Sequence, residues 1–331
     1  MNLGRFIEVS PLTKYIAGRV LQFIPLVFWV IVINFVIIHL APGDPVIFLA
    51  GQYEATPEYI AKMRLEFGLD KPLIAQLGVY LWKVLHGDLG YSMRFQQPVL
   101  DLILGRVPAT LILMISGLLI GSVLGVVLGV VFTRRSEFSE NAAVLIAVAC
   151  HSMPVFWIGQ NLLIIFSLHL GIFPAQGMFG MRVRETGFAA FWDLLRHLAL
   201  PAITYATYHL TLVFRLTRAK MLEVLSQDYM ITARGKGLSR FAILYRHALP
   251  NAILPVITVL GVSVGFMLAG SVLVETVFAW PGMGRLMFEA VLARDYPVLL
   301  GLFIVTSLMV MIANLVTDII YALMDPRVDY K

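Results

Sequence analysis

The chain has 331 residues, of which 59% are hydrophobic and only 14% are charged, and its formal net charge is +5. Soluble domains average about 25% charged residues, so this composition excludes an ordinary soluble globular protein as well as a disordered chain. The single cysteine, Cys150, cannot form an intramolecular disulfide, and the sequence has no Cys/His cluster typical of a metal site. The composition therefore predicts an integral membrane protein.

Six apolar stretches are long enough to cross a bilayer as helices, which takes about 20 mostly apolar residues. In chain order they cover residues 20–40, 107–132, 142–168, 198–214, 251–274 and 298–324. The fourth is the weakest, because Pro201 interrupts it early. Pro154 predicts a bend in the third, which either lines a cavity or only serves packing. The expected fold class is an all-α membrane protein with six transmembrane helices.

An even number of spans places both chain termini on the same side of the membrane. The segments on that side carry Lys and Arg at about twice the density of the other side, so we expect both termini in the cytoplasm. The expected organisation is a cytoplasmic N-terminal segment (1–19), a first helix (20–40), an external helical segment (41–106), a membrane core (107–324) that includes a cytoplasmic segment (215–250), and a cytoplasmic tail (325–331).

The second span carries four glycines at four-residue spacing. They are Gly117, Gly121, Gly125 and Gly129. This spacing places four missing side chains on one face of a helix, so that another helix can approach closely. The pattern leaves open whether that helix belongs to the same chain.

Residues 227–255 are too polar to span the membrane and too regular for a linker. Gly237 is predicted to end a short helix and Ser239 to cap a second one, which Pro250 separates from the next span. Four residues of the second helix form one apolar stripe: Phe241, Leu244, Tyr245 and Ala248. We expect a helix pair that docks a partner. A helix on lipid headgroups is the alternative, and DNA or RNA is disfavoured because the pair is tethered between two spans.

Catalytic and ion-coupled functions have weaker support. Residues 261–265 match the Gly-x-Ser-x-Gly pattern of hydrolases, but they lie in an apolar helical run rather than a strand–turn–helix. The residues around Lys236 do not match the other residues that a phosphate-binding loop requires.

An ion-driven carrier, the alternative function, needs ionisable groups inside its spans. The candidates are Glu275, Asp318, His151 and His209. We favour ion pairs for the acids, with Arg285 or Arg294 for Glu275, and hydrogen bonds between helices for the histidines.

The cytoplasmic segment resembles a motif of the membrane subunits of ABC-type importers, Glu-Ala-Ala-x-x-x-Gly followed after nine residues by Ile-x-Leu-Pro. Ala233, Gly237, Leu249 and Pro250 match in register, whereas Ile231 and His247 replace the glutamate and the isoleucine. Further landmarks of the dipeptide/oligopeptide/nickel branch lie at residues 40–45, 87–92, 106–110, 274–282, 293–297 and 321–327. The long segment after the first span resembles the first of the two unlike permeases of these systems.

This resemblance implies a pore-forming permease subunit of an ATP-driven importer in the bacterial inner membrane, with no enzymatic activity or cofactor of its own. The implied partners are a second permease, two cytoplasmic ATPases that bind ATP and Mg²⁺, and a periplasmic or lipid-anchored binding protein. Dipeptides, longer peptides, glutathione, nickel chelates and some sugars are all possible solutes.

Two groups of residues receive roles from the resemblance. Coupling to the ATPases is expected from Thr232, Ala233, Gly237, Phe241, Leu244, Tyr245, Leu249 and Pro250. An external gate or a contact with the binding protein is expected from Asp44, Glu275, Arg294 and Asp295.

Overall fold

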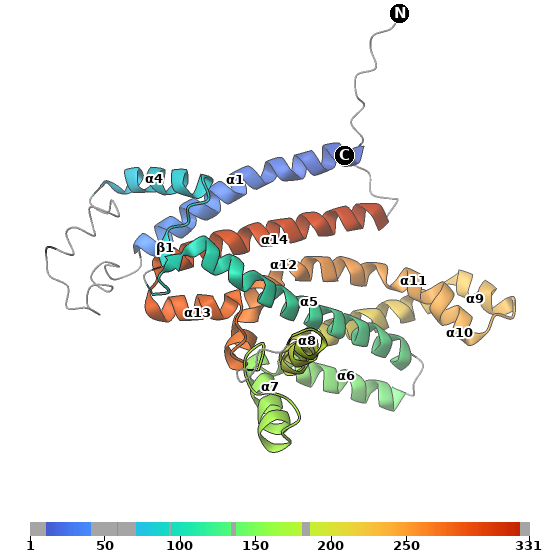
Figure 1. The fold of residues 1–331 in the computed structure, drawn as a ribbon. Helices are drawn as coiled ribbons and strands as arrows, with labels where there is room; N and C mark the ends of the chain where they lie inside the picture. The colour runs from blue at the N-terminus through green and yellow to red at the C-terminus, as the bar shows by residue number, and fades with distance from the viewer. Residues whose placement is uncertain are drawn as a thin grey trace, which may run out of the picture. The chain divides into compact units, whose positions relative to one another are not determined.

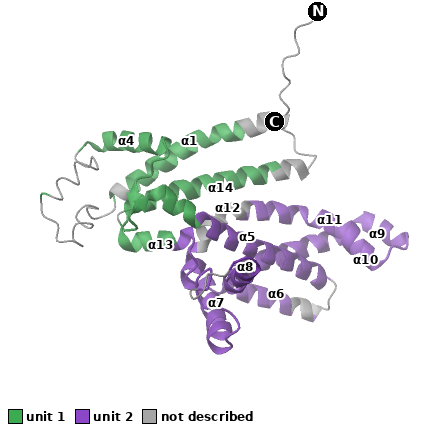
Figure 2. Ribbon diagram, in the orientation of Figure 1, with its two compact units in different colours: residues 1–106, 286–331 green, residues 107–285 purple. Residues whose placement is uncertain are grey.

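The computed structural model describes residues 11–40, 58, 71–92, 94–133, 137–180 and 186–324, and this part of the chain is almost entirely helical (Figure 1). The chain divides into two compact units, one made of residues 1–106 and 286–331 and the other of residues 107–285 (Figure 2). The predicted contact Asp44 and the predicted C-terminal tail lie outside the described residues.

The first unit is built on two long helices, α1 (Pro11–Leu40) and α14 (Tyr296–Met324), which pack side by side (Figure 1). Arg19 of α1 and Asp318 of α14 form an ion pair of 3.2 Å. Gly301 of α14 faces Val99, where a Cβ on the glycine would lie 2.6 Å from a valine methyl group. Outside the face that packs on α14, much of α1 is exposed, including Trp29, as expected for a helix surrounded by lipid.

The segment between the first two spans was predicted to be helical, and its described part contains one helix and a small hairpin. Helix α4 (Leu73–Leu85) contacts α1, with the Tyr80 and Phe35 rings 5.9 Å apart. Burial raises the pKa of the Tyr80 phenol. Strands β1 (Tyr91–Ser92) and β2 (Gln97–Pro98) pair antiparallel, with Tyr91 opposite Pro98.

The second unit surrounds α8, a helix of 38 residues (Phe188–Leu225) that packs against α6, α7, α11 and α12. Its other elements, in chain order, are α5 (Val99–Phe132), which begins in the first unit, α6 (Glu137–Ser152), α7 (Val155–Leu162), the π-helical η1 (Leu163–His169), α9 (Asp228–Gly235), α10 (Arg240–Ala242), the π-helical η2 (Ile243–Ala248), α11 (Leu249–Ala252) and α12 (Leu254–Val277). Helix α13 (Met283–Ala293) leads back to the first unit.

Three described helices are long and apolar enough to cross a membrane: residues 18–37, 99–132 and 296–319. Two bent pairs bring the number to five if each pair is one span: Ala142–Ser152 with Val155–His169, bent by 100°, and Arg240–Ala252 with Leu254–Gly261, bent by 40°. The structure therefore supports a helical membrane protein, whereas the predicted number of six spans is not confirmed. The predicted fourth span lies within α8, which is not among these candidates.

The second and third predicted spans can be compared with the helices of the structure. Helix α5 begins at Val99 rather than at residue 107, because a helix can extend beyond the apolar stretch and Asp101 in its first turn favours the positive helix end. The bend that Pro154 predicted in the third span is present. This proline stands before α7 with an extended ψ of 133°, and the helices on its two sides form an angle of 100°.

Candidate functional site

A helix pair lies at one end of α8 and α12 (Figure 1). Its first half is α9, and its second half is the continuous run of α10, η2 and α11. The turn between its two halves has the predicted chemistry. Gly237 has φ +73° and its N–H donates to the Arg234 carbonyl, while the Ser239 hydroxyl accepts from the Ala242 N–H. A left-handed glycine followed by a serine cap thus ends one helix and begins the next.

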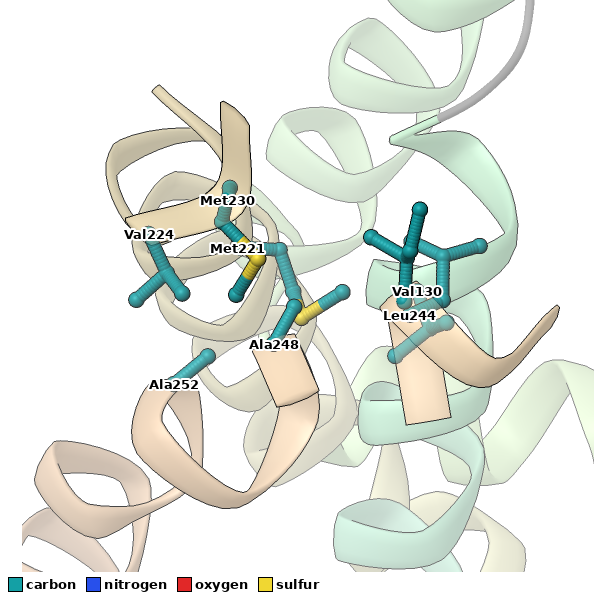
Figure 3. Packing of buried hydrophobic residues seen from close by; sticks show 8 residues of the cluster. Val130, Met221, Val224, Met230, Leu244, Ala248 and Ala252 are labelled. Carbon is teal, nitrogen blue, oxygen red and sulfur yellow. The ribbon is translucent and has the colours of Figure 1, made fainter. Parts of the chain in front are cut away.

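A buried apolar cluster holds the helix pair on the ends of α5 and α8 (Figure 3). Val130 comes from α5, Met221 and Val224 from α8, and Met230 from α9. The second half of the pair contributes Ile243, Leu244, Ala248 and Ala252, with Leu249 partly buried beside them. Fully burying a large apolar side chain contributes about 1.5–3 kcal/mol, so this cluster fastens the helix pair firmly to the long helices.

The predicted apolar stripe of the second helix is split between two faces. Leu244 and Ala248 are buried at 4% and 0% exposure, whereas Phe241 is 67% and Tyr245 40% exposed. The physical reason is η2, whose π-helical turn does not follow the 3.6-residue period on which the stripe was predicted. The exposed rings of Phe241 and Tyr245 lie 4.4 Å apart and form an aromatic pair.

The outer side of the helix pair is apolar and basic, and we call it the helix-pair surface. It comprises the aromatic pair, the exposed side chains Tyr229, Ile231 and Leu238, and the exposed cations Arg234, Lys236, Arg240 and Arg246. Of the other predicted coupling residues, Thr232 and Pro250 are exposed. Ala233 is buried at 8% exposure and supports the surface from within.

All four glycines of the predicted stripe face α8 of the same chain, which answers the question that the sequence left open. An added Cβ at Gly121 would lie 2.7 Å from the Ala206 carbonyl oxygen, and one at Gly125 would lie 2.8 Å from the Cβ of Val213. Gly117 and Gly129 are equally close to the side chains of Tyr205 and Thr217. Contacts this short leave no space for any side chain, so the stripe sets the distance between α5 and α8.

Glu275, a predicted gate or contact residue, is fully buried at 0% exposure. Its carboxylate accepts from the Thr110 hydroxyl at 2.8 Å and from the Arg285 N–H at 2.9 Å. The Thr110 hydroxyl also accepts from the Met283 N–H, and a Cβ at Gly282 would overlap the carboxyl group. Glu275 therefore joins the end of α12 to α5 and offers no surface to a partner.

Asp295 is also inside the protein, at 3% exposure, where it accepts a 2.6 Å hydrogen bond from the Ser92 hydroxyl. Both carboxylates are thus hydrogen-bonded within the chain, and the role of Glu275 and Asp295 at an external gate or a binding-protein contact stays a prediction. Arg294 is exposed and has a left-handed φ of +52°.

The remaining ionisable candidates also have defined surroundings. Asp318 is paired with Arg19, as its interpretation as an ion-pair residue predicted. The ring of His151 stacks on that of Tyr208 at 4.7 Å. His209 is buried, and its Nδ1 has no hydrogen-bond partner among the described residues, so the predicted hydrogen bond is not present at this nitrogen.

Hydrolase and metal chemistry find no support in the described residues. Ser263 lies within α12 and donates to the Val259 carbonyl, so the Gly-x-Ser-x-Gly match is helical and lacks the exposed turn that a nucleophile requires. Within the described ranges, no group of three or more His, Cys, Asp or Glu side chains is placed to hold a metal ion.

These features define a helical membrane protein that presents a firmly packed docking element. Residues 117–330 match the family model of the binding-protein-dependent transport system inner membrane component, and residues 12–114 match the model of the N-terminal part of such membrane components. The chain belongs to this family, and the resemblance noted in the sequence is confirmed.

Similar proteins cover the chain almost from end to end. It is 38% identical to the dipeptide transport system permease protein DppB of Escherichia coli K12, over 96% of this chain and 99% of the relative. The di/tripeptide transport system permease protein DppB of Pseudomonas aeruginosa UCBPP-PA14 is also 38% identical, over 96% and 99%. A putative peptide transport system permease protein of Brucella abortus 2308 is 39% identical, over 96% and 100%. The chain is a pore-forming permease subunit of an ABC importer and not itself an enzyme.

Proposed function

We propose that this permease carries short peptides across the inner membrane. The support is the named substrate class of the relatives, which are dipeptide, di/tripeptide and peptide permeases similar along their whole length. The chain would cross the membrane six times with both termini in the cytoplasm, including a first helix at residues 20–40 and an external segment at residues 41–106. The cytoplasmic segment at residues 215–250 would then carry most of the helix pair.

In this proposal the helix-pair surface docks on a cytoplasmic ATPase. The exposed aromatic pair is the observation that carries it, because Phe241 is 67% exposed although Leu244 and Ala248 of the same short helical stretch are buried. The same helix pair carries four exposed cations, so the complementary surface should be an apolar pocket with an acidic rim. The buried cluster beneath would pass a movement of the ATPase to α5 and α8 as a rigid-body displacement.

The other proposed partners are a second permease that completes the pore, a second ATPase and an external binding protein. ATP and Mg²⁺ would bind only to the ATPases. Arg294 remains a candidate contact for the binding protein because it is exposed, and Asp44 remains one from the sequence alone.

Transport by the purified complex in proteoliposomes tests the proposed function. With the binding protein on one side and ATP with Mg²⁺ on the ATPase side, a labelled dipeptide should accumulate. A non-hydrolysable ATP analogue should stop accumulation, and a protonophore should not. Uptake that needs no ATP and stops with the protonophore would instead support the ion-coupled carrier.

A further inference from the structure

An exposed patch with three polar side chains surrounds the break between α6 and α7, and we call it the break patch. It consists of His151, Ser152, Met153, Pro154 and Tyr208, all of which are exposed. The His151 and Tyr208 rings are stacked, with centroids 4.7 Å apart and planes at 28°. Two helices that are distant in the sequence thus place an imidazole, a phenol and a hydroxyl at one point of the second unit.

The break patch lies at membrane depth. Residues 142–152 and 155–169 qualify as a membrane span only together, and the break stands between them. On α8, Tyr208 is adjacent to His209, whose Cβ would lie 3.0 Å from an added Cβ at Gly121 in the middle of α5. Since α5 is itself a candidate span over residues 99–132, this packing places the patch at the level of the middle of that span.

Lipid is a poor environment for this patch. The last carbonyl groups of a helix have no partners within that helix, and unsatisfied backbone groups in hydrocarbon cost several kcal/mol each. One carbonyl near the end of α6, that of Val148, accepts a hydrogen bond from the Ser152 hydroxyl. Non-helical backbone at membrane depth occurs where it is covered by protein or lines a water-filled cavity.

Two further observations favour an aqueous cavity that binds a polar solute. The C-terminus of α6, a helix of 16 residues, has the partial negative charge of aligned peptide dipoles and attracts cations. His209, the next residue after Tyr208, has a buried Nδ1 without a hydrogen-bond partner among the described residues, and its ring lies 5.5 Å from that of Tyr208. A buried polar atom without a partner indicates an unseen water or ligand.

We propose that the break patch lines the route of the transported solute and binds the ammonium and amide groups of a short peptide. The ammonium group would lie at the carbonyl end of α6, and the stacked His151 and Tyr208 side chains would exchange hydrogen bonds with peptide amides. This proposal rests on the proposed function for the identity of the solute, although the aqueous character of the patch can be tested without it.

Cysteine labelling in the assembled transporter tests the proposal. Cys150 is the only cysteine, so Cys150→Ser gives a cysteine-free chain into which Ser152→Cys or Ile146→Cys is introduced. Ile146 is the matched control, because it is 65% exposed on the same helix but belongs to an apolar surface. The thiolate is the nucleophile that attacks a charged thiol reagent, and it forms in water and not in lipid, so Ser152→Cys should react at least about tenfold faster than Ile146→Cys.

Equal, slow labelling of the two positions would overturn the proposal. So would fast labelling of Ser152→Cys in the isolated chain that is lost in the assembled transporter, because the patch would then be an interface between permeases. A dipeptide should slow the labelling, and the same dipeptide with an acetylated amino group should not. Equal protection by both would contradict the ammonium site. None of these readouts needs transport, so they remain informative if peptide uptake fails.

Discussion

Glu275 is a fully buried carboxylate whose contacts span 165 residues of sequence, since it accepts from the Thr110 hydroxyl and from the backbone of Arg285. Nearby, the Trp280 indole N–H donates to the Ala109 carbonyl at 2.8 Å. These bonds connect the turn after α12 to one short stretch of α5. Removing one partner of such a buried bond leaves the other unsatisfied.

The substitution Glu275→Gln should destabilise the protein. The new amide NH₂ group would face the Thr110 hydroxyl or the Arg285 backbone N–H, both of which donate to the carboxylate. Two donors cannot bond to each other, and a buried unsatisfied polar group costs about 1–3 kcal/mol. Thermal unfolding of the detergent-solubilised chain measures the effect. Glu223→Gln is the control, because Glu223 is 58% exposed and pairs only with a neighbour on the same helix. Equal midpoints for the two variants would contradict the structural role of Glu275.

Asp318 should not carry protons. It is 33% exposed and paired with Arg19, and a partly exposed ion pair contributes about 0–1 kcal/mol. Asp318→Asn should therefore retain ATP-driven uptake within about twofold, with an unchanged dependence on pH. Uptake measured across pH values in proteoliposomes checks this expectation. Loss of transport together with an altered pH profile would return Asp318 to consideration as a proton relay.

At the scale of elements, the contact between α5 and α8 depends on the absence of side chains. The glycines of α5 meet Tyr205, His209, Val213 and Thr217, which also recur every four residues along α8. Two rows of the same spacing therefore lie against each other, as in close helix packing in membranes.

The substitution Gly121→Ala should separate α5 from α8. The new methyl group would lie 2.7 Å from a backbone oxygen, which cannot move away alone, and overpacking of this kind costs about 1–3 kcal/mol. Gly105→Ala is a matched control on the same helix, since a Cβ there meets nothing within 4 Å and alanine favours a helix by about 1 kcal/mol. The amount of folded protein that is recovered after heating measures the stability of both variants. A Gly121→Ala variant as stable as Gly105→Ala would contradict the packing role.

The helix pair shows how far local sequence signals reach. Gly237 and Ser239 predicted the turn correctly, because left-handed geometry and side-chain capping depend on a few adjacent residues. The division of the stripe between Phe241 and Leu244 was not predictable, since it arises from a π-helical turn that no residue type signals. Likewise, Pro154 predicted a bend but not its angle of 100°, which is set by packing of α7 on α8 and α12.

For the whole molecule, hydrophobicity predicted a helical membrane protein, and ordered motifs predicted its family. The contacts of Glu275 with Thr110 and of Asp295 with Ser92 could not be predicted, because nothing local connects residues 165 and 203 positions apart. The resemblance suggested an external gate or a binding-protein contact for both acids, and it carries no information about these distant donors. Only the folded chain brings each carboxylate to its hydroxyl partner.

The helix-pair surface is the proposed site at which this permease is coupled to an ATPase. The buried cluster includes residues of α5, α8 and both halves of the helix pair, so changes to the exposed aromatic pair should leave the fold intact. The double variant Phe241→Ser, Tyr245→Ser removes that pair alone. Phe188→Ser is the control, because Phe188 is 80% exposed at the other end of α8.

The most direct measurement is gentle detergent co-purification from the native membrane, with mass spectrometry of the recovered proteins. The wild-type chain and the Phe188→Ser variant should bring down a second permease and one or two ATPases. The double variant should retain the permease and lose the ATPases. Recovery of the wild-type chain alone after crosslinking would contradict the proposed coupling. Recovery of as much ATPase subunit with the double variant as with the wild type would contradict it as well.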